Sequence, residues 1–232
     1  MKKLLNAAIA IVFSYNSSFA QELKEKTKLL YDQTELVYSV DEQNKKSGPV
    51  LIRDNKSDKV YLRGAYKDDK PTGKWYFFQA DGNVESYYNY DDDKLLFIDP
   101  AYIGKMQITI KSRDPEAIKN AAIPIMLYPS STFLNQIVKD VKLEDYEFGG
   151  KTELPVAISA IVKANGQVEY MASYKVADKM VYKDIQLSHR DLAKIFIPAK
   201  YEGKPLESVL TLNTTLVNDK TGPGHKRFIW NY

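Results

Sequence analysis

Between Thr34 and Tyr90 apolar and polar residues alternate, and this period of two constrains the fold of the chain more than any other feature of its sequence. A period of two places successive side chains on opposite faces of an extended strand. Turn-forming segments rich in Gly, Pro, Asp and Asn separate the alternating runs, at residues 46–49, 54–58, 68–73 and 81–82. We therefore expect a meander of short antiparallel strands.

One aromatic cluster in this region is Trp75-Tyr76-Phe77-Phe78. Alternation puts Trp75 and Phe77 on one face of the strand and Tyr76 and Phe78 on the other. At least one aromatic face must then be covered by another part of the chain or offered to a partner. Packing against a neighbouring domain is the commoner arrangement. The alternative is a contact surface for a protein or a glycan, for which Trp75 and Phe77 are candidate residues.

The last third of the chain has the pattern of an α+β domain. Two strands, at residues 154–163 and 167–176, flank Ala164-Asn165-Gly166, a hairpin signal in which Gly can adopt positive φ. Residues 182–196 have a helical pattern, and residues 206–217 form a last long strand. We expect a three-stranded antiparallel sheet covered by one or two helices.

The region between these two parts is mixed. Residues 103–110 alternate as a strand, and Asp114-Pro115-Glu116 begins a short helix that extends to Ala122. Ser130, Ser131 and Thr132 can each cap a second helix, whose apolar residues recur at helical spacing at Phe133, Leu134, Ile137, Val138 and Val141. The end of the chain, residues 226–232, is basic and then aromatic, and we expect it to dock as a terminal strand.

The first twenty residues have the pattern of a secretory signal peptide. Lys2 and Lys3 precede an apolar run, and Ser18-Phe19-Ala20 places small residues at both cleavage-site positions. We predict cleavage after Ala20 and a periplasmic or secreted protein. The apolar run is shorter than the roughly 20 residues that a membrane-spanning helix needs, and the chain has no Cys for lipid attachment. Residues 21–30 are a charged lead-in compatible with a helix, and we expect this segment to fray or to cap a sheet edge.

Charge and composition favour a binding protein over an enzyme. Loss of Lys2 and Lys3 would lower Lys+Arg from 33 to 31 against 30 Asp+Glu, and a nearly neutral chain gives no reason to expect nucleic acid or an anionic membrane as a partner. Without Cys there is no thiol catalysis and no Cys-based zinc site. The two histidines, His189 and His225, offer little for a metal site or a Ser-His-Asp arrangement. We expect no catalytic residue, no cofactor and no metal.

Part of the meander resembles the MORN-related repeat of YwqK-type proteins. The resemblance covers roughly residues 46–97 and lies mainly in the second of two degenerate units. It is carried by Gly64-Ala65-Tyr66-Lys67, Pro71-Thr72-Gly73-Lys74-Trp75-Tyr76-Phe77-Phe78, Asp81-Gly82-Asn83-Val84 and Tyr90. In those proteins a Gly-x-Trp strand, an aromatic strand and an x-Gly turn recur, and the resemblance implies hairpins whose aromatic residues cover one another.

Residues 128–217 resemble the C-terminal domain of TonB-like proteins. The matching segments are 157–167, with Asn165-Gly166-Gln167-Val168 the most similar, followed by Phe196-Ile197-Pro198-Ala199, Gly203-Lys204-Pro205-Leu206 and the closing strand 209–216. The resemblance implies an envelope protein that recognises a partner by a sheet edge, with the strand 206–217 as the place to look. TonB-like energy transducers keep a membrane helix and a long Pro-rich segment, which this chain lacks, so we expect no energy transduction.

These patterns predict a β-rich α+β protein with four parts: a signal peptide (1–20), a MORN-like meander (21–100), a TonB-C-like domain (101–217) and a tail (218–232). The predicted function is a non-enzymatic envelope module that binds an extended protein or peptide segment by adding it as a strand. Its candidate contact residues are Trp75, Phe77, Leu206, Val209, Thr211 and Asn213. The alternatives are an antitoxin-like or structural role for the MORN-related half and, third, an envelope hydrolase that uses two carboxylates.

Overall fold

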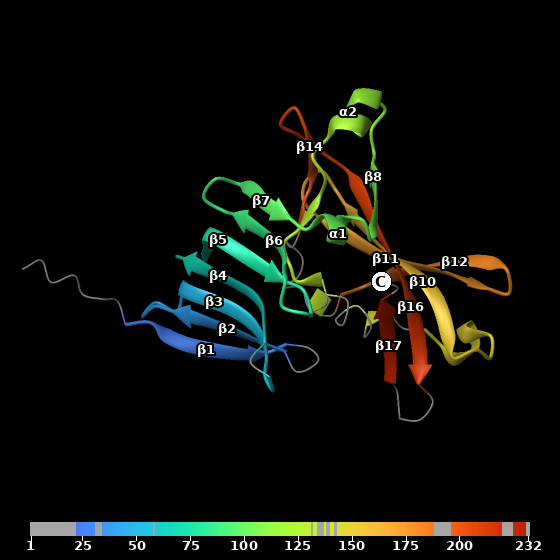
Figure 1. Cartoon of the computed structure of the whole chain (residues 1–232), viewed down its shortest axis with the longest axis horizontal. Helices are drawn as coiled ribbons and strands as arrows, with labels where there is room; N and C mark the ends of the chain where they lie inside the picture. The colour runs from blue at the N-terminus through green and yellow to red at the C-terminus, as the bar shows by residue number, and fades with distance from the viewer. Residues whose placement is uncertain are drawn as a thin grey trace, which may run out of the picture.

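The computed structural model describes residues 22–230 except 31–33, 58, 131, 134–136, 138–139, 142, 188–195 and 220–224. The predicted signal peptide lies outside the described residues. Two antiparallel sheets dominate the fold, one on each side of a shared core (Figure 1). In the described part of the chain no helix is long and apolar enough to cross a membrane.

The first sheet is a seven-stranded meander in which each strand pairs with the strands next to it in sequence. It contains β1 (Lys24–Leu29), β2 (Thr34–Val40), β3 (Lys46–Asp54), β4 (Val60–Lys67), β5 (Lys70–Phe78), β6 (Val84–Asn89) and β7 (Lys94–Ile98). The meander predicted from the period of two is confirmed. The charged lead-in caps the edge of the sheet, as expected, but as a strand and not as a helix. Residues 24–29 pair along their whole length with β2, and this pairing outweighs their local helical preference.

The inner face of this sheet is packed around Trp75. An added Cβ on Gly64 would lie 2.4 Å from the Trp75 ring, so glycine is needed where the ring crosses the neighbouring strand. The Trp75 indole N–H donates to the Ala65 carbonyl at 3.1 Å. The rings of Tyr66 and Tyr90 contact it edge-on, each with its centroid 5.2 Å away. This arrangement fixes which face of the meander is turned inward.

The second sheet has six strands, in the order β12-β11-β10-β16-β17 with β8 also on β16. Its members are β8 (Met106–Ile110), β10 (Glu153–Val162), β11 (Val168–Val176), β12 (Lys179–Ile185), β16 (Ser208–Asp219) and β17 (His225–Trp230). The predicted strands β10, β11 and β16 are at its centre, and the β10–β11 turn has Gly166 at φ 83°. The predicted three-stranded sheet is therefore only the middle of the real one.

The helix expected over residues 182–196 was wrong at its start, because residues 182–185 belong to the strand β12. A two-residue turn, Ala177-Asp178, joins β11 to β12, and both residues have positive φ. Such turns close tight hairpins, and their usual sequence signal is Asn or Gly. Ala177-Asp178 lacks this signal, so the turn was not predicted. Residues 182–185 continue the hairpin as strand, and residues 188–195 lie outside the described part.

Short elements lie outside the two large sheets. They are α1 (Pro100–Ile103), α2 (Pro115–Asn120), η1 (Asp145–Phe148), β9 (Ile125–Met126), β13 (Phe196–Ile197), β14 (Ala199–Tyr201) and β15 (Lys204–Leu206). The expected helix after Asp114 is α2, and the Asp114 carboxylate accepts from the Glu116 amide at 2.9 Å. Phe133 and Ile137 are helical and buried, as expected for the segment after Ser130.

A single buried cluster joins the two sheets. It contains Trp75, Phe77 and Tyr88 from the meander together with Phe133, Ile137 and many side chains of the second sheet. The meander ends at Ile98, close to the expected boundary at residue 100, but the two parts do not have separate cores. The final segment docks as a terminal strand, as expected, because β17 pairs with β16.

Candidate binding surface

The two aromatic candidates predicted in the meander are core residues. Trp75 is 5% exposed and Phe77 is 0% exposed, so neither offers a surface to a partner in this structure. The alternation was correctly predicted, and its covered face is the Trp75 and Phe77 face. The opposite face carries Tyr76 and Phe78, both half-buried.

The other four candidates lie on or near β16, which is not an open edge. Leu206 ends β15, while Val209, Thr211 and Asn213 are in β16. One side of β16 is paired with β10, and the other side is paired with β8 over 208–212 and with β17 over 214–219. The expectation of an accessible last strand was therefore wrong. The sequence predicted strands at residues 103–110 and 226–232, which correspond to β8 and β17. It contained no signal that they pair with β16.

The meander has two outer strands, β1 and β7, and they differ in composition. Figure 1 shows them at opposite ends of the sheet, and among the described residues each pairs with one neighbouring strand. The β1 sequence KEKTKL is mostly charged, whereas the β7 sequence KLLFI has one charge and four large apolar residues. Exposed edge strands normally carry charges that prevent further pairing, so of these two strands β7 is the one with little charge protection.

A row of stacked side chains crosses the outer face of the sheet and ends at β7. We call it the outer row, and it consists of Arg63, Tyr76, Tyr87 and Phe97, which are direct cross-strand neighbours on β4 to β7. The Arg63 guanidinium lies 4.8 Å from the Tyr76 ring centroid. The Tyr76 and Tyr87 centroids are 5.3 Å apart, and those of Tyr87 and Phe97 are 5.5 Å apart with the rings 16° from parallel. The outer row is separate from the buried cluster.

The β7 end of the outer row is accessible. Phe97 is 39% exposed and Leu96 is 37% exposed. A register shift between the Tyr87/Phe97 and Tyr88/Leu95 pairs places Leu96 in a bulge. The Asp99 amide donates to the Glu85 carbonyl at 2.8 Å, and backbone groups point alternately to either side of an antiparallel strand, so those of Ile98 point away from β6.

A second site was not predicted from the sequence: a buried carboxyl group between the two sheets. Phe77 pairs with Ser86 but Phe78 pairs with Val84, and this bulge in β6 turns the Glu85 side chain inward beside Ser86. Glu85 is 0% exposed, and its Oε2 accepts a hydrogen bond from the Ser130 hydroxyl at 2.6 Å. Burial is the main cause that raises the pKa of Glu85 to about 7. Alternation alone gives no sign of a bulge at this position.

The Tyr102 hydroxyl on α1 lies near Glu85 and Ser130. It interacts electrostatically with the carboxyl group, yet it makes no hydrogen bond of acceptable geometry, and Glu85 Oε1 also lacks one. Burial raises the pKa of the Tyr102 hydroxyl well above its usual value. Glu85 and Tyr102 are buried, while Ser130 is partly exposed. Because the carboxyl and phenol groups are shielded from solvent, we assign the cluster no catalytic role.

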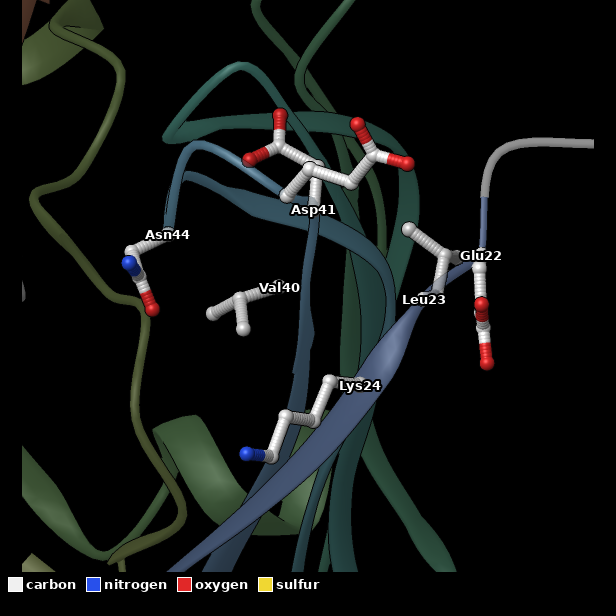
Figure 2. A pocket seen from close by; sticks show the side chains of 7 residues that line it. Glu22, Leu23, Lys24, Val40, Asp41 and Asn44 are labelled. Atoms are coloured by element: carbon white, nitrogen blue, oxygen red, sulfur yellow. The ribbon is translucent and has the colours of Figure 1, made fainter.

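A hollow of about 430 Å³ lies at the start of β1, and Figure 2 shows side chains that line it. It is lined by Glu22, Leu23, Lys24, Val40, Asp41, Glu42 and Asn44. Asp41 Oδ1 accepts from the amides of Gln43 and Lys45, both at 2.9 Å, so this carboxylate builds the β2–β3 turn. Asn44 accepts from the Lys26 ammonium at 3.0 Å. These polar groups are occupied by neighbouring residues, and we assign no ligand to the hollow.

Comparison with known proteins gives no identification: no family model, no curated protein and no solved structure matches this chain. Among the described residues, no group of three or more His, Asp or Glu side chains is arranged to hold a metal ion. The geometry of the surface is therefore the basis for a candidate function.

Proposed function

We propose that this chain is a non-enzymatic binding protein of the cell envelope that holds an extended segment of another protein by adding it as a strand to β7. The observation that carries the proposal is the apolar outer edge of β7, where the outer row ends at the exposed ring of Phe97. An edge with few charges next to an exposed aromatic side chain is suited to recognition by strand addition.

Main-chain hydrogen bonds would supply most of the affinity. The backbone groups of Ile98 point away from β6 and are positioned to pair with an incoming strand. Leu96 and Phe97 supply apolar surface beside them. Binding of this kind needs no reacting group, so the proposal includes no catalytic residue.

The outer row indicates which partner side chain fits best. Neighbouring strands are about 4.8 Å apart, so an added strand places one side chain close to the outer side of Phe97. Tyr76, Tyr87 and Phe97 each occupy the same register position on successive strands. An aromatic side chain on the partner would continue this stack, and such pairs contribute about 0.5–1.5 kcal/mol beyond area burial.

The resemblances noted in the sequence enter the proposal in different ways. The TonB-like resemblance and the predicted signal peptide support an envelope location. The last strand, which that resemblance favours as the recognition edge, is paired on both sides, so we place recognition on the meander instead. The meander is the part that resembles MORN-related repeats, and the alternative built on that resemblance also expects residues 21–100 to bind the partner.

A peptide selection tests the proposal. Residues 21–232, the predicted mature chain, are used to select from a random peptide library, and the dissociation constants of the selected peptides are measured for three proteins: the unchanged chain, Leu96→Lys and Leu29→Lys. Both leucines are exposed and lie on edge strands, so the variants form a matched pair.

We expect Leu96→Lys to weaken binding at least tenfold, because it puts a charge on the β7 edge, and Leu29→Lys to leave binding unchanged. Hydrogen exchange should show new protection of the Ile98 amide in the complex. A library that yields no binder, or binders insensitive to Leu96→Lys, would overturn the proposal.

A further inference from the structure

The buried carboxyl group of Glu85 joins two parts of the chain that are distant in sequence. Glu85 lies in β6 of the meander, and Ser130 lies in the part of the chain that follows it. We call the meander, residues 22–98, the first half and the rest of the described chain the second half. The hydrogen bond between Glu85 and Ser130 connects the two halves. Tyr102, from α1, is buried beside them. We call these three residues the polar joint.

The joint is poorly equipped to hold a negative charge. Among the described residues, the Ser130 hydroxyl donates to Oε2 at 2.6 Å and Oε1 has no hydrogen-bond partner, while the Ser130 backbone and the Tyr102 hydroxyl lower the pKa less than burial raises it. A buried ionised carboxylate needs several donors or a close cation to offset the loss of water. Burial dominates the environment of Glu85 and favours the neutral form, and its pKa of about 7 agrees with this.

Within the described part of the chain, few charged or titratable groups face Glu85. Tyr102 faces it from α1, and the Lys105 ammonium, just after α1, favours the ionised form but ranks below burial and the hydrogen bonds. The adjacent Asp99 uses its carboxylate elsewhere, because its oxygens accept from the Ala101 amide at 2.9 Å and from the Gln79 side chain at 2.6 Å. The groups around Glu85 therefore do not compensate for its burial.

We propose that the polar joint is a proton-controlled latch, in which neutral Glu85 holds the meander against the second half of the molecule and loss of its proton loosens this contact. The inference is independent of strand addition at β7. In an envelope compartment, whose pH follows the surroundings more closely than the cytoplasm does, such a latch would make the contact between the two halves respond to acidity.

The sign of the effect follows from linkage. The pKa of Glu85 is raised in the folded state above its ordinary value of 4.5. The folded state therefore binds the proton more tightly, and the stabilisation is fully present below pH 4.5 and is lost as the pH rises towards 7. Above that range the loss is complete and stability no longer depends on this group.

The test compares the unchanged chain with Glu85→Gln, which keeps the shape and a neutral hydrogen-bonding group. The matched control is Glu153→Gln, because Glu153 is an exposed glutamate on β10. Amide exchange, corrected for intrinsic rates, is followed from pH 4.5 to 8 at the Tyr102 and Phe133 amides, which donate to Asp99 and Pro129. Amides in the β10–β11 pair serve as an internal reference.

In the unchanged chain we expect local opening at Tyr102 and Phe133 to increase by about a hundredfold across this range, the order set by the pKa difference. Glu85→Gln should abolish most of this dependence, and Glu153→Gln should keep it. Parallel pH curves for the unchanged chain and Glu85→Gln would overturn the latch.

If Glu85→Gln does not fold, infrared spectroscopy of the unchanged chain decides the question. A buried protonated carboxyl gives a distinct C=O stretching band. We expect one such band at pH 5.5, with a loss centred near pH 7. A spectrum without a protonated carboxyl at pH 5.5 would show that Glu85 is already ionised, and the latch would be rejected.

Discussion

The two outer strands of the meander have the same role in the sheet but opposite chemistry. Four of the six residues of β1 are charged (Lys24, Glu25, Lys26 and Lys28), whereas Lys94 is the only charged residue of β7. Both strands pair with one neighbour among the described residues. An exposed edge does not by itself indicate a binding site. The informative feature is an edge without the charges that normally prevent association.

The surface next to β7 is also more apolar than the surface next to β1. Next to β7, the outer row presents three aligned aromatic rings, and the end ring, Phe97, is exposed. At β1 the exposed apolar residues are isolated ones, such as Leu29. The polar joint also lies near β7, because the amide of Asp99, which follows this strand, bonds to Glu85.

The largest expected effect is the difference in stability between substitutions on the two faces of β5, the inner face and the face that carries the outer row. Trp75→Ala should lower the free energy of unfolding by about 3–5 kcal/mol, because it removes a buried ring from the core. Tyr76→Ala, one residue along the same strand, should cost clearly less, since its ring is half-buried and outside the core cluster. Urea denaturation measures both. Equal costs would mean that the outer row is a structural element, which would weaken the case for a binding surface.

The second prediction distinguishes the two edges directly. Leu96→Lys should reduce the affinity for a selected peptide by a factor of ten or more, about 1.4 kcal/mol, because a charge at the pairing edge must be desolvated. Isothermal titration calorimetry on Leu96→Lys and on Leu29→Lys provides the comparison. An equal loss in both variants would indicate a general charge effect and no preference for β7.

The third prediction concerns the end of the outer row. Phe97→Ala should weaken binding of a peptide with an aromatic residue by roughly three- to tenfold, the size of one ring pair. Phe97→Leu keeps apolar area without the ring and should recover only part of the loss. The same variants should change the affinity of a matched peptide with Ala at that position much less. Identical effects on both peptides would leave strand addition intact and remove the aromatic preference.

The smallest expected effect comes from making the charged edge strand β1 more apolar, like β7. Replacing two exposed charges of β1, in the double variant Glu25→Val and Lys28→Val, should produce weak concentration-dependent association, because the edge loses its protection. Sedimentation velocity at increasing protein concentration detects it. A fully monomeric double variant would show that charge is not what keeps β1 from pairing.

Local sequence predicted those features of the fold that depend on neighbouring residues. The meander followed from a period of two interrupted by turn residues, and the β10–β11 hairpin from Asn165-Gly166. The β11–β12 hairpin was missed because Ala177-Asp178 lacks the residues that usually mark such a turn. Glu85 was missed because a bulge is set by pairing with the neighbouring strand and leaves no pattern in β6 itself.

The positions of the meander strands followed from the sequence, because alternation records successive side chains on opposite faces. Which face of β5 is buried did not follow, since both faces carry aromatic residues, Trp75 and Phe77 on one and Tyr76 and Phe78 on the other. Only the tertiary structure decided which edges remain open. Pairing of β8 and β17 with β16 depends on contacts between residues about a hundred positions apart or across a turn, and backbone hydrogen bonds are nearly independent of side-chain identity. The last strand was therefore closed and β7 left exposed by long-range packing.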